Sequence, residues 1–169
     1  YALAGLATVS NEGIQSAIVY IIIYIIMNLG LFSCLLMMKR NNKYYEDITD
    51  LSGLSKNHPL LSLSLLLILF SLAGIPPLAG FFAKFYIFKS VIEQSMYFLA
   101  IVGLLSTVVA AFYYLRIIKI IYFDPEKDKY DIDHSPWLKF SLIFSTVLIL
   151  FYFIFPSQLI EVVSRVNII

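Results

Sequence analysis

SLAGIPPLAGFFAKFYIF, the stretch from Ser71 to Phe88, decides how this chain folds. It lies in the middle of an apolar run from Pro59 to Ile92, and that run is too long for one straight helical crossing of a bilayer, which needs about 20 residues. Proline removes a backbone donor and clashes with the preceding turn, and the residue before a proline avoids the helical conformation. The sequence therefore predicts two half-helices joined by a break over residues 74–80. The residues that make this break are Gly74, Pro76, Pro77 and Gly80.

The composition and the other apolar runs indicate a membrane protein. Of the 169 residues, 60% are hydrophobic and 14% are charged, whereas soluble domains are about 45–50% apolar and about 25% charged. We predict an all-α fold: a polytopic bundle of transmembrane helices with one discontinuous helix, in a single membrane domain over residues 1–169. The short segment 1–9 is interpreted as the tail of a helix begun upstream. The predicted spans are 1–9 (partial), 14–38, 59–92 (broken at 74–80), 96–123 and 136–155.

The charges in the loops predict the orientation of the chain. Lys and Arg are enriched in short loops on the cytoplasmic or matrix side of a membrane. With alternating spans, the opposite side holds only Lys89 and Arg165 as basic residues. We therefore expect the C-terminus on the periplasmic or intermembrane-space side. The basic residues predicted on the cytoplasmic or matrix side are Lys39, Arg40, Lys43, Lys56, Arg116, Lys119, Lys127, Lys129 and Lys139.

Several kinds of function are disfavoured by the composition. The single cysteine, Cys34, lies inside an apolar run, so this chain alone cannot build a disulfide or a cysteine-ligated iron–sulfur site. The net charge of +1 and the absence of a basic stripe give no sign of nucleic-acid binding. His58 and His134 lie next to prolines in segments that we expect to be solvent-exposed loops, and neither is assigned a metal or catalytic role.

Lys84, four residues beyond the break, is the candidate site of chemistry. A charge at the centre of a transmembrane helix costs roughly 2.5 to 3.5 kcal/mol on insertion scales, so such a residue usually faces a polar cavity or a partner. Lysines held away from bulk water can exchange protons near neutral pH. Unwound backbone at this depth leaves carbonyl and N–H groups free to hold waters or partners. Together these features predict a hydrated gate with a proton-carrying lysine.

Simpler interpretations remain open for Lys84 and for its polar neighbours. Lys84 could extend to an interface, with the proline break serving only as a packing kink. Lys89, close to the end of the run, fits an interfacial anchor better than a buried site. Polar side chains within the other spans fit helix–helix contacts better than a water path. These polar residues are Asn28, Ser33, Ser71, Ser106 and Thr107.

The sequence resembles the antiporter-like subunits of respiratory complex I. The segment Ser71 to Phe88, with its GIPP-x(2)-GF-x(2)-K core, resembles the discontinuous late helix of that family. The DLSGL motif from Asp50 to Leu54 and AAFYYLRIIKIIYF from Ala110 to Phe123 resemble in particular the smallest of its three members. The resemblance extends in order from Tyr1 to about Phe155, and it marks the chain as the C-terminal portion of such a subunit.

This resemblance implies a membrane-arm subunit of NADH:quinone oxidoreductase that contributes to proton translocation coupled to electron transfer from NADH to ubiquinone. Such subunits hold no redox centre and move protons through inverted five-helix repeats, each with a broken helix. Lys84 would be the ionisable residue of the second repeat, near the outlet half-channel. The first repeat's glutamate and lysines have no counterparts here. NADH, FMN, iron–sulfur clusters and quinone are expected in other subunits, and no cofactor or metal is expected in this chain.

The expected partners are the other membrane-arm subunits and the lipid bilayer, and the expected location is the bacterial inner membrane or, alternatively, the mitochondrial inner membrane. Two other functions remain open. The chain could belong to a multi-subunit cation/proton antiporter or a membrane-bound hydrogenase, which share the broken helix and the lysine. It could also be a passive membrane scaffold, in which no ion crosses.

Overall fold

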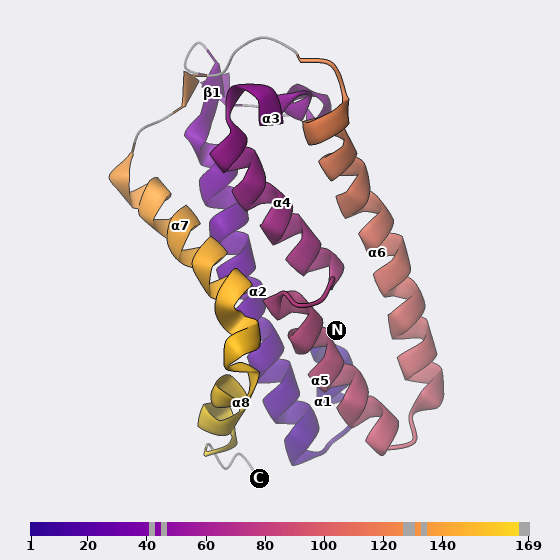
Figure 1. Cartoon of the computed structure of the whole chain (residues 1–169). Coiled ribbons are helices and arrows are strands. Elements are labelled where there is room, and N and C mark those ends of the chain that lie inside the picture. The colour runs from indigo at the N-terminus through magenta and orange to yellow at the C-terminus, as the bar shows by residue number, and fades with distance from the viewer. Residues whose placement is uncertain (41–42, 45–46, 127–130, 133–134, 166–169) are drawn as a thin grey trace.

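The computed structural model describes residues 1–40, 43–44, 47–126, 131–132 and 135–165, with only the backbone at 40, 43–44 and 131–132. Over these residues the chain is a bundle of helices that run roughly along one direction (Figure 1). This confirms the predicted all-α transmembrane class with one discontinuous helix. The helices are α1 (Ala2–Leu6), α2 (Asn11–Met37), α3 (Leu54–Asn57), α4 (Pro59–Ala73), α5 (Ala79–Glu93), α6 (Tyr97–Phe123), α7 (Pro136–Phe151) and α8 (Pro156–Ser164), with 3-10 turns at Ile48–Leu51 and Tyr152–Ile154.

Helix α2 is the centre of the bundle. It packs against α1, α4, α5, α7 and α8, whereas α6 lies at the edge and contacts α4 and α5 (Figure 1). The N-terminus of α2 is capped by Ser10, whose side chain accepts a hydrogen bond from the N–H of Gly13 at 3.1 Å. Within the described residues, three helical segments are long and apolar enough to cross a membrane: α2, α6 and Pro136–Ile154.

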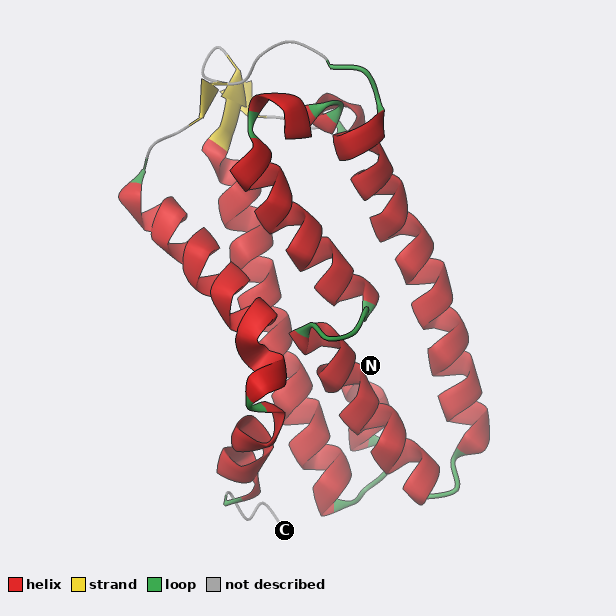
Figure 2. Ribbon diagram, viewed as in Figure 1, coloured by secondary structure: helices red, strands yellow, loops and turns green. Residues whose placement is uncertain are grey.

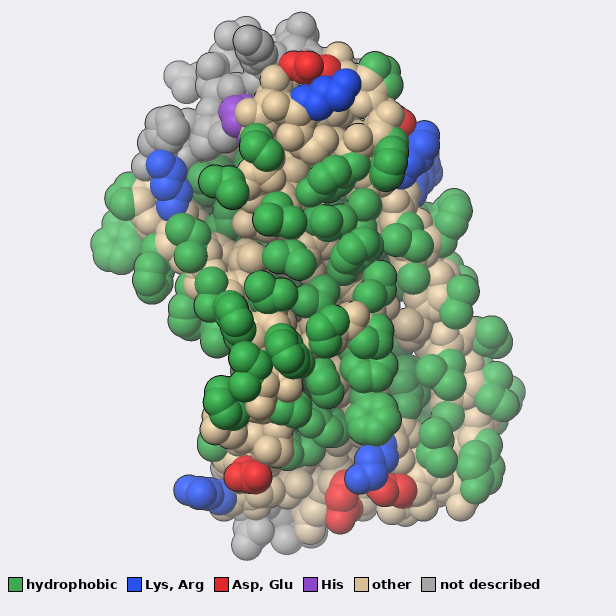
Figure 3. All heavy atoms as spheres, viewed as in Figure 1, with side chains coloured by type: hydrophobic (Ala, Val, Ile, Leu, Met, Phe, Trp, Pro, Cys, Tyr) green, Lys and Arg blue, Asp and Glu red, His purple; other side chains and the backbone are tan. Residues whose placement is uncertain are grey.

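The distribution of side chains over the surface agrees with a bilayer environment. On the face shown in Figure 3, a broad band of hydrophobic side chains covers the middle, and charged side chains lie towards the two ends. Much of this band comes from α6, where Phe98, Leu105, Val108 and Phe112 are exposed. Because water would disfavour such a surface, the exposed face of α6 is suited to lipid or to other helices.

A small antiparallel sheet connects two segments at one end of the bundle (Figure 2). Strand β1 (Met38–Arg40) lies between β2 (Lys43–Tyr44) and β3 (Asp131–Ile132). The sequence predicts polar loops for these segments and does not predict the strands. The pairing of residues 38–39 with 131–132 joins loops that are far apart in sequence. Lys127, Lys129 and His134, which enter the charge and histidine predictions, lie outside the described residues.

The DLSGL motif forms hydrogen bonds that connect the loop before α4 to the end of α6 and the residues that follow it. Gly53 has a left-handed backbone (φ 69°), and its N–H donates to the carbonyl of Ile120 at 3.2 Å. A side chain at Gly53 would collide with the backbone of Glu126. The Ser52 hydroxyl donates to the carbonyl of Pro125 at 2.7 Å. Glycine is required here both for its conformation and for the close approach of the two segments.

Candidate functional site: a helix break with a buried lysine

The first half of the discontinuous helix, α4, ends at Gly74. This glycine has a left-handed backbone (φ 88°), and its N–H donates to the carbonyls of Phe70 and Ser71. The N–H of Ile75 donates to the carbonyl of Phe70 at 3.0 Å. These bonds form the Schellman pattern that ends many helices. The second half, α5, begins at Ala79, and Figure 2 shows the connection midway along the bundle.

The two prolines leave two carbonyls of α4 without helical donors. In a continuous helix, the N–H of each residue donates to the carbonyl four residues before it. The carbonyls of Leu72 and Ala73 would therefore pair with positions 76 and 77. Both positions are proline, which has no N–H. Since unpaired backbone groups are costly at membrane depth, these carbonyls need another donor.

The side chain of Lys84 supplies that donor. Its Nζ lies 2.9 Å from the carbonyl oxygen of Leu72 and 3.2 Å from that of Ala73. The residue is only 8% exposed. Its positive charge lies at the C-terminal end of α4, where the helix dipole favours a cation. Within the described part of the chain, the ammonium has these carbonyls and one aromatic ring as partners, and no carboxylate.

Glycine and serine hold the two half-helices close together at the break. The N–H of Gly80 donates to the Ser71 hydroxyl oxygen at 2.9 Å, and that hydroxyl lies 3.1 Å from the sulfur of Met27 on α2. A Cβ at position 80 would collide with the Ser71 carbonyl. A Cβ at Gly74 would lie 3.2 Å from Cδ of Lys84, a tight approach. Lys84 thus lies against Gly74 at the end of α4, and Gly80 lies against Ser71 of the same helix.

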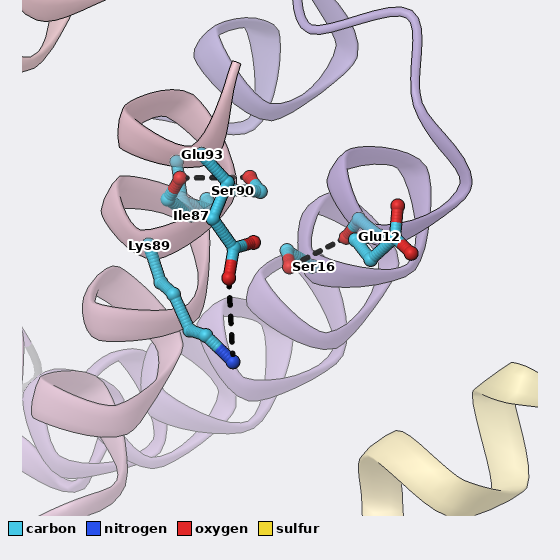
Figure 4. A network of polar contacts seen from close by, with 6 residues as sticks. All are labelled: Glu12, Ser16, Ile87, Lys89, Ser90 and Glu93. Atoms are coloured by element: carbon cyan, nitrogen blue, oxygen red, sulfur yellow. Dashed lines mark hydrogen bonds and ion pairs between the residues drawn. The ribbon is translucent and has the colours of Figure 1, made fainter. Parts of the chain in front are cut away.

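A cavity of about 460 Å³ lies beside the lysine, between α5 and α6. Its lining includes Gly74, Lys84, Phe88 and Thr107, and it extends to Lys89 and Glu93 at the end of α5. Lys89 forms an ion pair with Glu93 at 3.7 Å (Figure 4), and its side chain is 59% exposed. This exposed position agrees with the anchor interpretation of Lys89.

The polar residues within the spans mostly connect helices, as the sequence analysis favours. Ser33 on α2 donates to Ser141 on α7 at 2.9 Å. Ser106 and Thr107 on α6 hydrogen-bond to the hydroxyl of Tyr1. Asn28 is different, because its side chain bonds the carbonyl of Tyr24 within its own helix.

Two further sites differ from the sequence analysis. His58 precedes the first turn of α4 and is partly buried, so the expectation that it lies in a solvent-exposed loop is wrong. Tyr1, interpreted only as part of a helix tail, lies beside Lys84. No sequence signal marks this contact, because it joins positions far apart in the chain. Among the described residues, no group of three His, Cys, Asp or Glu side chains could hold a metal ion.

The comparison with known families identifies the class of protein. The family described as NADH:quinone oxidoreductase/Mrp antiporter, TM, matches residues 1–110. The chain belongs to this family.

Its relatives include proteins from several bacteria. The chain is 80% identical over 169 residues to the NADH-quinone oxidoreductase subunit N of Pelagibacter ubique (strain HTCC1062). This match covers 100% of the chain and 36% of the relative. Over 160 residues, covering 95% of the chain and 33% of the relative, it is 46% identical to subunit N of Parvibaculum lavamentivorans. The chain thus spans about a third of the length of the curated relatives that it matches.

Chains in solved structures share its fold. Respiratory complex I from Thermus thermophilus with bound aureothin contains a chain with a TM-score of 0.76 and 25% identity, covering 93% of this chain and 36% of that one. The Mrp complex from Dietzia sp. DQ12-45-1b contains a chain with a TM-score of 0.79 and 20% identity. The match covers 97% of this chain and 39% of that one. The second similarity is evidence for the fold alone.

Proposed function

We propose that this chain is part of subunit N, the smallest antiporter-like member of the membrane arm of NADH:quinone oxidoreductase, and that it contributes to proton translocation. The observation that carries the proposal is the buried Lys84 ammonium, which bonds two carbonyls that the prolines leave free. The 80% identity to a subunit N supports the choice of complex. In this proposal Lys84 takes up and releases the proton, and the subunit itself has no redox role.

In this proposal the charge of Lys84 is linked to the conformation of the break. Protonated, its ammonium donates to the carbonyls of Leu72 and Ala73 and so holds the ends of α4 and α5 together. When the amine loses a proton, the attraction to these carbonyls weakens, because a charged donor forms stronger hydrogen bonds than a neutral one. Proton release would therefore loosen the break. A movement of the break would in turn change how tightly the amine of Lys84 holds its proton.

The rest of the reaction belongs to other subunits in this proposal. NADH, FMN, iron–sulfur clusters and quinone would bind elsewhere in the complex, and this chain would contact neighbouring membrane-arm subunits and lipid. Its location would be the bacterial inner membrane, in keeping with the bacterial relatives. Its C-terminus would face the periplasm.

A cation/proton antiporter subunit is the second candidate, since the Mrp complex shares the fold. The curated relatives named subunit N favour the first candidate. Purification of the full-length protein distinguishes the two: NADH-quinone reductase subunits should copurify with it, and copurification of antiporter subunits in their place would overturn the assignment.

The test of the proposed function is NADH-driven proton pumping in membrane vesicles that carry Lys84→Met in the full-length subunit. Methionine is unbranched like lysine and replaces its apolar stem, but it lacks the amine and cannot carry a proton. We expect pumping to fall by at least about tenfold, as for the loss of a proton-transfer group, while native gels show an assembled complex.

Lys119→Met is the matched control. Lys119 is exposed on α6 and pairs with Asp124 at 3.0 Å, and exposed pairs of this kind contribute at most about 1 kcal/mol. Normal pumping is expected from this variant. If the assembled Lys84→Met complex also pumps normally, the lysine carries no proton and the scaffold interpretation is preferred.

A further inference from the structure

The aromatic ring of Tyr1 lies beside the ammonium of the buried Lys84. The Nζ of Lys84 lies 5.1 Å from the centroid of the Tyr1 ring. This is within the roughly 6 Å at which the negative face of an aromatic ring attracts a cation, and the attraction is strongest where water is excluded. The ammonium is thus held by two carbonyls of α4 and by this ring.

The hydroxyl of Tyr1 fixes the ring to α6. It lies 2.9 Å from Oγ1 of Thr107 and 3.2 Å from Oγ of Ser106. Both of those hydroxyls donate their own protons to the carbonyl of Gly103, at 3.1 Å and 2.7 Å respectively. Since each hydroxyl has one proton to donate, Tyr1 is the donor toward this pair of hydroxyls, and Ser106 and Thr107 are the acceptors.

Aromatic neighbours fix the tilt of the same ring. Its centroid lies 5.9 Å from that of Tyr20 on α2 and 6.0 Å from that of Phe88 on α5, with the Phe88 ring nearly perpendicular at 85°. The absence of a side chain at Gly103 lets Phe88 pack against α6. Tyr1 therefore contacts α2, α5 and α6 in addition to Lys84, and few other side chains could satisfy all these contacts.

We propose that Tyr1 is a positioning residue for Lys84: its ring holds the ammonium against the break, and its hydroxyl ties that position to α6. A shift of α6 relative to α5 would then move the ring and change how firmly the ammonium is held. The importance of this residue for transport rests on the proposed function. The positioning itself can be tested without any transport measurement.

The experiment measures amide hydrogen exchange at residues 74–80 in the assembled complex with the full-length subunit. Four proteins are compared: the parent, Tyr1→Leu, Lys84→Met and the double variant. We expect Tyr1→Leu to speed exchange at the break several-fold, because the ammonium is less firmly held. In the Lys84→Met background, where no ammonium remains, Tyr1→Leu should add little. A purely structural role for the ring would give the same acceleration in both backgrounds, and that result would overturn the proposal.

Tyr1→Phe separates the ring from the hydroxyl. Phenylalanine keeps the aromatic face, so exchange at the break should stay closer to the parent than in Tyr1→Leu, while pumping falls because the ring has lost its bond to α6. Equal acceleration by Phe and Leu would contradict the role of the ring. Tyr97→Phe, at an exposed tyrosine of α6, is the control and should leave both measurements unchanged. If Lys84→Met pumps normally, the proposed function fails, whereas the exchange result still decides the positioning.

Discussion

Individual residues at the break act by satisfying backbone groups that the break exposes. Lys84 donates to the carbonyls of Leu72 and Ala73, and Ser71 accepts from the N–H of Gly80. Each of these bonds replaces one that a continuous helix would have made. Because lipid offers no alternative partner, a change at any of them should affect both the stability and the function of the site.

Gly80→Ala tests how closely the half-helices must approach. The added methyl would collide with the carbonyl of Ser71, so α4 and α5 must separate. Overpacking of this kind typically costs about 1–3 kcal/mol. We expect faster amide exchange at residues 79–83 and reduced proton pumping. Val109→Ala, on the exposed face of α6, is the control. Parent-like exchange in Gly80→Ala would show that the contact can relax without cost.

At the scale of the element, the discontinuous helix is a balance between a straight helix and the lysine-held break. Each proline in a helix interior costs about 3 kcal/mol, so Pro76 and Pro77 together make the continuous form strongly unfavourable. The same two residues free the carbonyls that bind Lys84. The prolines therefore both break the helix and create the polar environment of the lysine.

The double variant Pro76→Ala, Pro77→Ala tests this double role. Two N–H groups become available to the carbonyls of Leu72 and Ala73 and compete with the ammonium. We expect α4 to extend, seen as slow exchange of the two new amide hydrogens at positions 76 and 77, and proton pumping to fall. The matched control is Pro136→Ala, because Pro136 lies in the first turn of α7, where its missing N–H is not needed. Unchanged pumping in a double variant with an extended α4 would show that the break is dispensable.

At the scale of the whole molecule, the charged side chains on the face shown in Figure 3 lie towards the two ends of the bundle, with apolar side chains between them. The C-terminal helix α8 lies at the same end as the first turn of α2 and the last turn of α5 (Figure 1). That end is the one predicted to face the periplasm. The opposite end has the sheet, α3 and the end of α6.

Cysteine labelling in intact cells tests this orientation. Cys34 is buried and is first replaced by alanine in the full-length subunit. Ser164→Cys, on α8, should then react with a membrane-impermeant maleimide added outside, after passage through the outer membrane. Asp47→Cys, in the exposed loop before α4, should react only after the cells are opened. The reverse pattern would show that the charge-based orientation is wrong.

The sequence by itself determined the transmembrane class and the discontinuous helix, and it singled out Lys84 as the candidate site, because these depend on local properties. The length of an apolar run shows whether it can cross a bilayer. A proline pair breaks a helix wherever it occurs, and a charge in an apolar run needs a partner. Only the tertiary structure decided which partners those are. It placed Lys84 on the carbonyls of Leu72 and Ala73, brought Tyr1 over the ammonium, and paired residues 38–39 with 131–132. Such contacts depend on how distant helices and loops pack against one another, and the order of residues along a single chain does not record that packing.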